Sequence, residues 1–313
     1  MNEPITQSKS WQKLQKDLKE TSFYEKNADF SYLAILKSTP VGNYLYLPYG
    51  PVAETEKGLK KALESLSKLA KTKSAIFTRI EPQNAKYAPL LAKYGIKSHD
   101  LNPKDTWILD LEPDEATLKS NFSQGTRTRY NQFPKKGLSV TTSRDPADIK
   151  YLVDLQRPLA ESKKISTFDE NYLKTELKQD FATLYLVHYT KDSSDSDHII
   201  AASLFFDYED TRYYMQSAAS LDPEYRKLPA TVALLATAIF DAKSAGLTKF
   251  DFWGIAPDGA PKDHPWAGFT SFKKSFGGTP VHYCGTWDIV YHPLKYKLYQ
   301  LLRQLNRLKR KIQ

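Results

Sequence analysis

The sequence predicts an α/β (α+β) fold in which mixed sheets are flanked by helices. Hydrophobic residues form 41% of its 313 residues, which is enough for a packed core. Strand-like runs alternate with helical periodicities along the whole chain. Both halves also repeat one pattern of strands, a long helix and a strand ending in a carboxylate, Glu81 in the first half and Asp251 in the second.

The first half begins with a helix over residues 11–18, which Ser10 can cap. Leucines at helical spacing predict a second helix over residues 57–70. Apolar runs bounded by Pro and Gly turn signals predict strands at residues 30–36, 44–47, 75–80 and 107–111.

A connector with a helix at residues 114–121, a basic segment at 123–137 and a strand at 138–142 leads into the second half. There the pattern predicts helices at residues 148–160, 169–179 and 229–245, and strands at 183–189, 199–206, 213–217 and up to Asp251. Gly246 stops the long helix, and the polar run 192–197 predicts a hairpin loop. We therefore expect two domains, residues 1–143 and 144–293.

Residues 294–313 form a last predicted helix with its leucines on one face. Lysines and arginines supply charge elsewhere on this helix. One interpretation is a helix that packs on the first domain and keeps its lysines in water. The other is peripheral contact with an anionic membrane or with RNA.

Composition limits the cellular setting and the chemistry. The net charge of +9 favours polyanionic partners such as nucleic acid or anionic membrane. The single Cys284 fits a reducing compartment, and no apolar run or signal peptide is present, so we expect a cytoplasmic protein. The six histidines are scattered without ligand spacing, so we expect no metal site.

The segment 249–278 carries the strongest chemical signal. A buried strand ends near Asp251 and Gly254, a Pro/Gly-rich loop follows, and a helix then carries Lys273 and Lys274. This order brings an acid, a cation and flexible backbone around one cleft. The structural alternatives are a carboxylate that caps a loop and lysines on a solvated helix face. Phe269, Phe272 and Phe276 have ordinary core spacing.

Six motifs in the same order resemble those of the Fem (FemABX) aminoacyltransferases, which build peptidoglycan cross-bridges. These motifs are Trp11-Gln12-Lys13 and the segments 46–52, 77–82, 106–111, 123–137 and 250–278. The resemblance implies two GNAT-like acyltransferase domains, with the C-terminal helix 294–313 returning to the first domain. It also implies transfer of an amino acid from aminoacyl-tRNA to the stem-peptide amine of lipid II or UDP-MurNAc-pentapeptide, with no metal or diffusible cofactor.

The resemblance also assigns residues. Glu81 and Asp251 become the candidate catalytic carboxylates, and Lys273 becomes the candidate catalytic cation. The candidate substrate-binding residues are Lys13 and Tyr172 toward the precursor pyrophosphate, Arg127 and Arg129 toward tRNA, and Tyr214 and Phe276.

Two departures from the family pattern affect these assignments. Glu81 stands where Asp is usual, and residues 165–169 lack the arginine that grips the diphosphate of the UDP precursor in some members. The second departure favours lipid II as the acceptor.

Two other functions stay open. One is a GNAT-like N-acyltransferase with a different acyl donor, although the approach to the helix at 229–245 lacks the glycines of a CoA loop and contains Pro229. The other is a non-catalytic RNA or membrane binder that uses Arg127, Arg129 and the lysines near them. The sequence does not predict the amino acid transferred or the oligomeric state.

Overall fold

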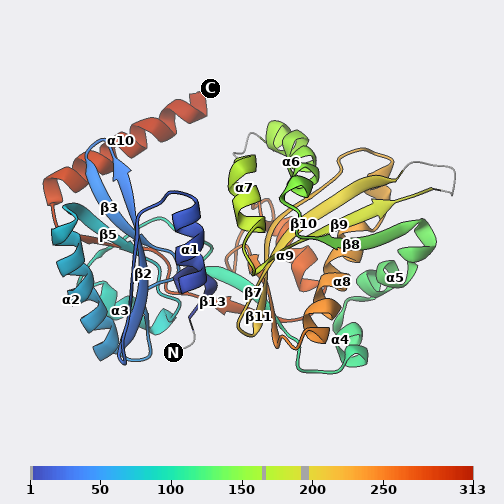
Figure 1. Ribbon diagram of the computed structural model, residues 1–313, viewed down its shortest axis with the longest axis horizontal. Coiled ribbons are helices and arrows are strands. Elements are labelled where there is room, and N and C mark those ends of the chain that lie inside the picture. Colours follow the sequence, from blue (N-terminus) through green and yellow to red (C-terminus); the bar gives the residue numbers. More distant parts are fainter. Residues whose placement is uncertain (1–2, 164–166, 192–196, 313) are drawn as a thin grey trace. The chain divides into compact units, whose positions relative to one another are not determined.

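The computed structural model describes residues 3–163, 167–191 and 197–312 (Figure 1). The chain divides into two compact units, Met1–Lys104 with His282–Gln313 as unit 1, and Asp105–Val281 as unit 2. Each unit contains one seven-stranded mixed sheet flanked by helices, which confirms the predicted fold class. Within the described residues, no helix has the length and apolarity needed to span a bilayer.

The sheet of unit 1 has the order β1-β2-β3-β5-β14-β6, with β4 on the free edge of part of β2. Strands β3 and β5 are parallel, and α2 joins them. The strands are β1 (Ser22–Lys26), β2 (Phe30–Thr39), β3 (Gly42–Leu47), β4 (Val52–Ala53), β5 (Ala75–Ile80), β6 (Ile96–Lys97) and β14 (Trp287–Val290).

The helices of unit 1 are α1 (Lys9–Asp17), α2 (Glu56–Thr72), α3 (Ala88–Leu91) and α10 (Pro293–Ile312). Helix α1 starts earlier than predicted, because Ser8 and not Ser10 accepts the capping hydrogen bond from the Trp11 N–H. Helix α2 buries Leu59, Leu63 and Leu66, as its leucine spacing predicts. Helix α10 packs against β5 through Tyr296.

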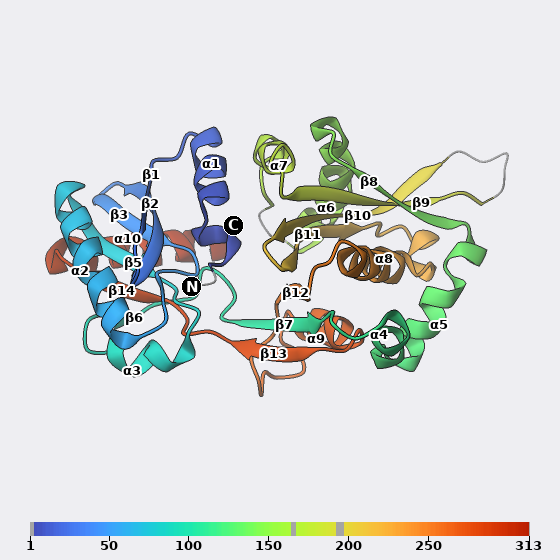
Figure 2. The same cartoon turned by 60° about the horizontal axis from the view of Figure 1, so that its bottom comes forward.

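The sheet of unit 2 has the order β13-β7-β12-β11-β10-β9-β8. Its strands are β7 (Asp105–Asp110), β8 (Leu138–Ser143), β9 (Ala182–Tyr189), β10 (His198–Tyr208), β11 (Thr211–Ala219), β12 (Lys249–Gly254) and β13 (Thr279–His282). Helices α6 (Ile149–Lys163) and α7 (Glu170–Leu177) cover one face, and α8 (Ala230–Ser244) covers the other (Figure 2). Helices α4 (Glu115–Asn121), α5 (Gln124–Gln132) and α9 (Ala267–Lys274) complete the unit.

The two sheets share one strand order, which explains the pattern repeat in the sequence. In each, an antiparallel ladder leads to a strand that runs parallel to the next one across a helix: β3, α2 and β5 in unit 1, and β11, α8 and β12 in unit 2. The next strand is antiparallel in both sheets, β14 beside β5 and β7 beside β12.

The unit boundaries differ from those expected at residues 143 and 293. Strands β7 and β8 belong to the sheet of unit 2, and β14 belongs to the sheet of unit 1. The reason is long-range pairing: β7 pairs with β12, Ile108 opposite Asp251, although more than a hundred residues separate them. Local periodicity carries no information on such pairing. Residues 192–196, in the predicted hairpin loop, lie outside the described residues.

Candidate functional site

The parallel strands β11 and β12 separate where the predicted catalytic carboxylate lies. They pair only from Thr211–Lys249 to Tyr213–Asp251, although β11 continues to Ala219. On the other side of β12, the register with β7 shifts between Asp251 and Gly254. Trp253, inside this irregularity, has a φ of 63°. Bulges and left-handed non-glycine residues are costly and gather at functional sites.

Asp251 is buried at this point, with 3% of its surface exposed. The Thr106 hydroxyl donates a hydrogen bond to its Oδ1, and the Trp253 N–H donates another at 2.7 Å. Burial raises the pKa of Asp251 to about 6, against the opposing effects of these two hydrogen bonds and of the Lys273 charge. The carboxyl therefore changes its protonation state close to neutral pH.

Lys273 lies on α9 and is 9% exposed. Its Nζ donates to the Gly254 carbonyl at 2.5 Å and lies 5.9 Å from the ring centroid of Tyr214. Burial lowers the pKa of Lys273 to about 8, while the Asp251 charge opposes the shift. An acid and an amine thus titrate on either side of neutrality within one buried site, the pattern expected of acid–base machinery.

Local structure holds α9 in this position. The Thr270 hydroxyl accepts a hydrogen bond from the Ala256 N–H at 2.8 Å and so ties the loop after β12 to the helix. Gly278 has a φ of 96°, and a Cβ there would lie 2.5 Å from the Ile108 carbonyl. Only glycine permits the chain to leave α9 and run beside β7 at this distance.

Glu81, the other predicted carboxylate, lies in unit 1 in a different environment. Its two oxygens accept hydrogen bonds from the Tyr46 hydroxyl, the Thr286 hydroxyl, the Asn102 amide and the backbone N–H groups of Leu101 and Asn102. This set of donors occupies the carboxylate and fastens the loop after β6 to the sheet. The geometry is that of a structural anchor.

The motif containing Glu81 also contains Arg79, which forms a buried ion pair. Arg79 forms a bidentate ion pair with Asp288 on β14, with both nitrogen–oxygen distances at 2.7 Å. The side chains of Arg79 and Asp288 are 2% and 0% exposed. Because β14 comes from the far end of the chain, this buried pair connects segments that are distant in sequence.

The basic candidates have different surroundings. Arg127 donates from Nη1 to the carbonyls of Ser120, at 2.6 Å, and of Phe122, so it ties α4 to α5. Arg129 is exposed on α5 and is the cation of this pair that can reach a polyanion. Lys13 lies on α1, 62% exposed, and its Nζ is 3.3 Å from the Asp17 carboxylate.

The aromatic candidates also differ from one another. Tyr172 on α7 stacks on Phe168 with ring centroids 4.9 Å apart. Tyr214 lies beside Lys273, as described above. Phe276 is 0% exposed and packs against Phe122 and Phe252, so its prediction as a substrate-binding residue needs correction: it is a core residue with no surface to offer.

Sequence reasoning did not identify two contributors to the site. Thr106 holds the Asp251 carboxylate, and the Trp253 backbone supplies the second donor. Thr106 begins one of the motifs quoted above, so a signal for it existed. No sequence signal indicated the left-handed conformation of Trp253, since it depends on the bulge between β12 and β7.

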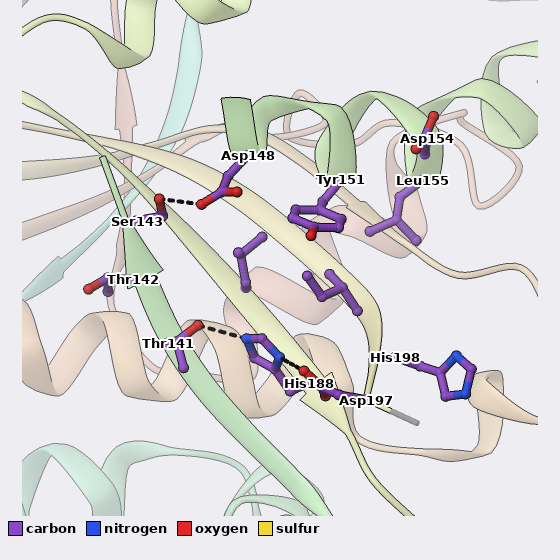
Figure 3. A pocket seen from close by; sticks show the side chains of 12 residues that line it. Thr141, Thr142, Ser143, Asp148, Tyr151, Asp154, Leu155, His188, Asp197 and His198 are labelled. Atoms are coloured by element: carbon purple, nitrogen blue, oxygen red, sulfur yellow. Dashed lines mark hydrogen bonds and ion pairs between the residues drawn. The ribbon is translucent and has the colours of Figure 1, made fainter. Parts of the chain in front are cut away.

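A pocket of about 600 Å³ lies in another part of unit 2, between β8, β9, β10 and α6 (Figure 3). His188 bridges the Thr141 hydroxyl at 2.7 Å and the Asp197 carboxylate at 2.6 Å on its wall. Neither Asp251 nor Lys273 lines this pocket. Across the described parts of the chain, no group of three His, Cys, Asp or Glu side chains is arranged to hold a metal ion.

Comparison with known proteins places this geometry in context. A sequence model of the FemAB family matches residues 186–304, which include Asp251 and Lys273. None of the curated proteins matches the sequence. Among solved structures, that of FemX is similar with a TM-score of 0.81 and 17% identity over 95% of this chain and 94% of that one.

Two further solved structures share the fold. The C-terminal domain of a candidate lysylphosphatidylglycerol synthetase from Agrobacterium fabrum has a TM-score of 0.62 and 14% identity, covering 94% of this chain and 91% of that one. A tandem GNAT protein from the clavulanic acid biosynthesis pathway has a TM-score of 0.52 and 12% identity, with 84% and 80% covered.

The family match and the shared fold together support an acyltransferase. The match over residues 186–304 and the fold shared with FemX support membership of the Fem family. They support an enzyme of the peptidoglycan cross-bridge aminoacyltransferase kind, the kind that the six sequence motifs resemble.

Proposed function

We propose that this protein transfers an amino acid from aminoacyl-tRNA to the stem-peptide amine of a peptidoglycan precursor, with lipid II as the favoured acceptor. The observation that carries the proposal is the buried pair of Asp251 and Lys273, whose pKa values of about 6 and about 8 lie on either side of neutral pH. Aminolysis of an ester needs a proton acceptor for the attacking amine and a cation for the developing oxyanion.

The proposed reaction assigns one task to each group. The acceptor amine attacks the ester carbonyl carbon, a C–N bond forms, and Asp251 takes the proton that the amine loses. Lys273 stabilises the negative charge on the carbonyl oxygen. The C–O bond to the tRNA ribose then breaks, and the leaving 3′ oxygen receives the proton from Asp251. No metal or diffusible cofactor takes part in these steps.

Charge and sequence support the choice of substrates. The net charge of +9 and the exposed Arg129 suit a tRNA donor, which also implies a cytoplasmic location because charged tRNA is made there. Residues 165–169 contain no arginine for a UDP diphosphate, which favours the lipid-linked precursor.

A transfer assay with mixed radiolabelled aminoacyl-tRNAs tests the proposal. Lipid II in detergent, UDP-MurNAc-pentapeptide and phosphatidylglycerol serve as separate acceptors, the last because a solved structure with this fold is described as a candidate lysylphosphatidylglycerol synthetase. We expect label on lipid II. Label on phosphatidylglycerol alone would show that this lipid, and not a peptidoglycan precursor, is the acceptor. Label on none of the three would refute the reaction.

Lys273→Ala and Lys274→Ala form a matched pair for this assay. Lys274 is the neighbouring lysine on α9, and its Nζ lies over the Trp107 ring rather than at Asp251. We expect Lys273→Ala to lose about 100-fold or more of the transfer rate, the size seen when one oxyanion donor is removed. Lys274→Ala should retain most of it. Equal rates in the two variants would contradict the role of Lys273.

A different acyl donor remains the second candidate, since a tandem GNAT protein shares the fold. The α8 N-terminus argues against acyl-CoA, because Pro229 precedes Ala230 there and provides no N–H for a phosphate. Thermal stabilisation by acetyl-CoA, with no label transferred from tRNA, would favour this candidate over the first.

A further inference from the structure

Helix α10 presents a row of exposed leucines. Leu294, Leu298, Leu301 and Leu305 are 83%, 47%, 51% and 46% exposed. Their spacing of four, three and four residues places them on one face of the helix. We call these four residues the leucine stripe. A continuous apolar stripe in water is costly, and such a patch usually marks a contact surface.

The leucine stripe is not the face that attaches α10 to unit 1. Tyr296 is 3% exposed, donates to the Asp288 carboxylate at 2.8 Å and packs edge-on against Phe77. Tyr299 packs on the same ring, and the Arg303 guanidinium lies 2.6 Å from His99. With about 100° of rotation per residue, Tyr296, Tyr299 and Arg303 lie on the side of α10 opposite the stripe. Tyrosines, and not the leucine stripe, therefore dock this helix.

The charge on α10 identifies the kind of partner. Residues 293–313 contain seven lysines and arginines and no aspartate or glutamate. Lys295 and Lys297 are exposed and flank the leucine stripe on its two sides. A partner that satisfies both features must be anionic and must accept apolar side chains. RNA offers phosphates but no apolar region that could take up leucine side chains, whereas an anionic bilayer offers both charged headgroups and acyl chains.

We propose that α10 lies in the plane of an anionic membrane surface, with the leucine stripe in the acyl-chain boundary and the flanking lysines at the lipid headgroups. The tyrosine face keeps the helix on unit 1, so the whole unit is carried to the membrane. This inference stands apart from the transfer reaction, because it uses no residue of the Asp251–Lys273 site.

Vesicle flotation of the full chain tests the proposal. Vesicles of phosphatidylcholine with about 30% phosphatidylglycerol are compared with vesicles of phosphatidylcholine alone. This fraction of anionic lipid gives the vesicle surface a substantial negative potential. We expect binding to the anionic vesicles that weakens as salt is raised, and little binding to the neutral ones. Equal binding to both kinds, or to neither, would overturn the proposal.

Three variants separate the two contributions. Leu298→Gln with Leu301→Gln removes apolar surface at constant charge, and we expect it to weaken binding by about tenfold or more. Lys295→Gln with Lys297→Gln should weaken binding by about fivefold per lysine, and only on anionic vesicles. Leu221→Gln is the control, because Leu221 is an exposed leucine (39%) that belongs to unit 2 and not to α10.

Two checks keep the result decisive. The melting temperature of each α10 variant should match that of the natural sequence, because the substituted side chains are exposed and lie on the side of α10 opposite Tyr296. Sedimentation velocity without lipid tests a second copy of the chain as the occupant of the stripe. A dimer that the Leu298→Gln, Leu301→Gln variant dissociates, together with vesicle binding unaffected by it, would assign the stripe to self-association instead.

Discussion

Asp251 and Lys273 are both nearly buried, and burial moves their pKa values in opposite directions. The acid rises to about 6 and the amine falls to about 8, since desolvation disfavours the charged form of each. An ionised Asp251 and a protonated Lys273, the states that the proposed aminolysis requires, therefore coexist mainly in a narrow range around neutral pH. Residue identity alone would put these pKa values far apart, near 4 and above 10.

The pH dependence of the reaction follows from these values. We expect a bell-shaped profile of kcat/KM, with an acidic limb near pH 6 as Asp251 becomes protonated and a basic limb near pH 8 as Lys273 loses its proton. Steady-state rates in overlapping buffers with a stable aminoacyl-ester analogue measure both limbs. A profile flat from pH 5 to 9 would exclude both groups from the rate-limiting chemistry.

Asp251→Asn should separate stability from activity. The folded-state pKa of Asp251 is raised from 3.8 to about 6, so the ionised carboxylate costs about 3 kcal/mol of stability at pH 8, at about 1.4 kcal/mol per unit. The variant removes that cost, and we expect a gain of about 1–3 kcal/mol at pH 8, with loss of transfer. The gain should disappear as the pH falls from 6 to 4. Chemical denaturation of both proteins at pH 8 and at pH 4 tests the sign of this change in stability.

Glu81 and Asp251 show how equivalent elements take on different tasks. Each belongs to the second strand of a parallel pair: Glu81 directly follows β5 in unit 1, and Asp251 lies within β12 in unit 2. The Glu81 carboxylate is occupied by side-chain and backbone donors from the loop around Asn102 and from Thr286. Asp251 accepts from Thr106 and Trp253 and lies beside a lysine. The topology repeats, while the hydrogen-bond partners of the two carboxylates differ.

Substitution of Glu81 should therefore act on stability. Glu81→Ala leaves buried donors such as the Tyr46 hydroxyl without an acceptor, and we expect a loss of about 3 kcal/mol of unfolding free energy. Glu81→Gln should recover part of it and keep measurable transfer. If Glu81→Gln is as stable as the natural sequence but inactive, Glu81 has the catalytic role that the family resemblance assigns to it.

The chain as a whole interleaves its two units. Strand β7 follows unit 1 in sequence but completes the sheet of unit 2, and β14 follows unit 2 but completes the sheet of unit 1. Arg79 and Asp288 fix the second of these pairings with a buried ion pair. A cut at the midpoint of the sequence would therefore separate each unit from one of its own strands, β7 from unit 2 and β14 from unit 1.

Fragment folding tests this organisation. Residues 105–281 contain every strand of the second sheet, except the last residue of β13, and we expect them to fold cooperatively on their own. A fragment of residues 1–143 lacks β14 and α10, which leaves Arg79 buried without its partner, at a cost of about 3–5 kcal/mol. We expect it to be unfolded or aggregated. Circular dichroism and thermal melts of both fragments provide the readout, and a cooperative melt of 1–143 would contradict the interleaved assignment.

Much of the element pattern was predictable from local sequence. The spacing of Leu59, Leu63 and Leu66 predicts α2, and the apolar run at residues 75–80 coincides with β5. The short strand β1 was missed, because Ser22–Lys26 is only partly buried and has no clear alternation. Helix α10 coincides with the helix predicted at residues 294–313 to within one residue, but the leucine pattern did not indicate that tyrosines form its buried face.

By itself, the sequence determined the α/β class, the repeat of strands around a long helix, and the placement of Asp251 and Lys273 in one segment. These features depend on periodicity and on residues close together in the chain. The tertiary structure alone decided which sheets β7 and β14 join, which hydrogen bonds Glu81 accepts, and how the pKa values of Asp251 and Lys273 shift. Each of these depends on burial and on hydrogen bonds between residues far apart in sequence, which no local pattern encodes.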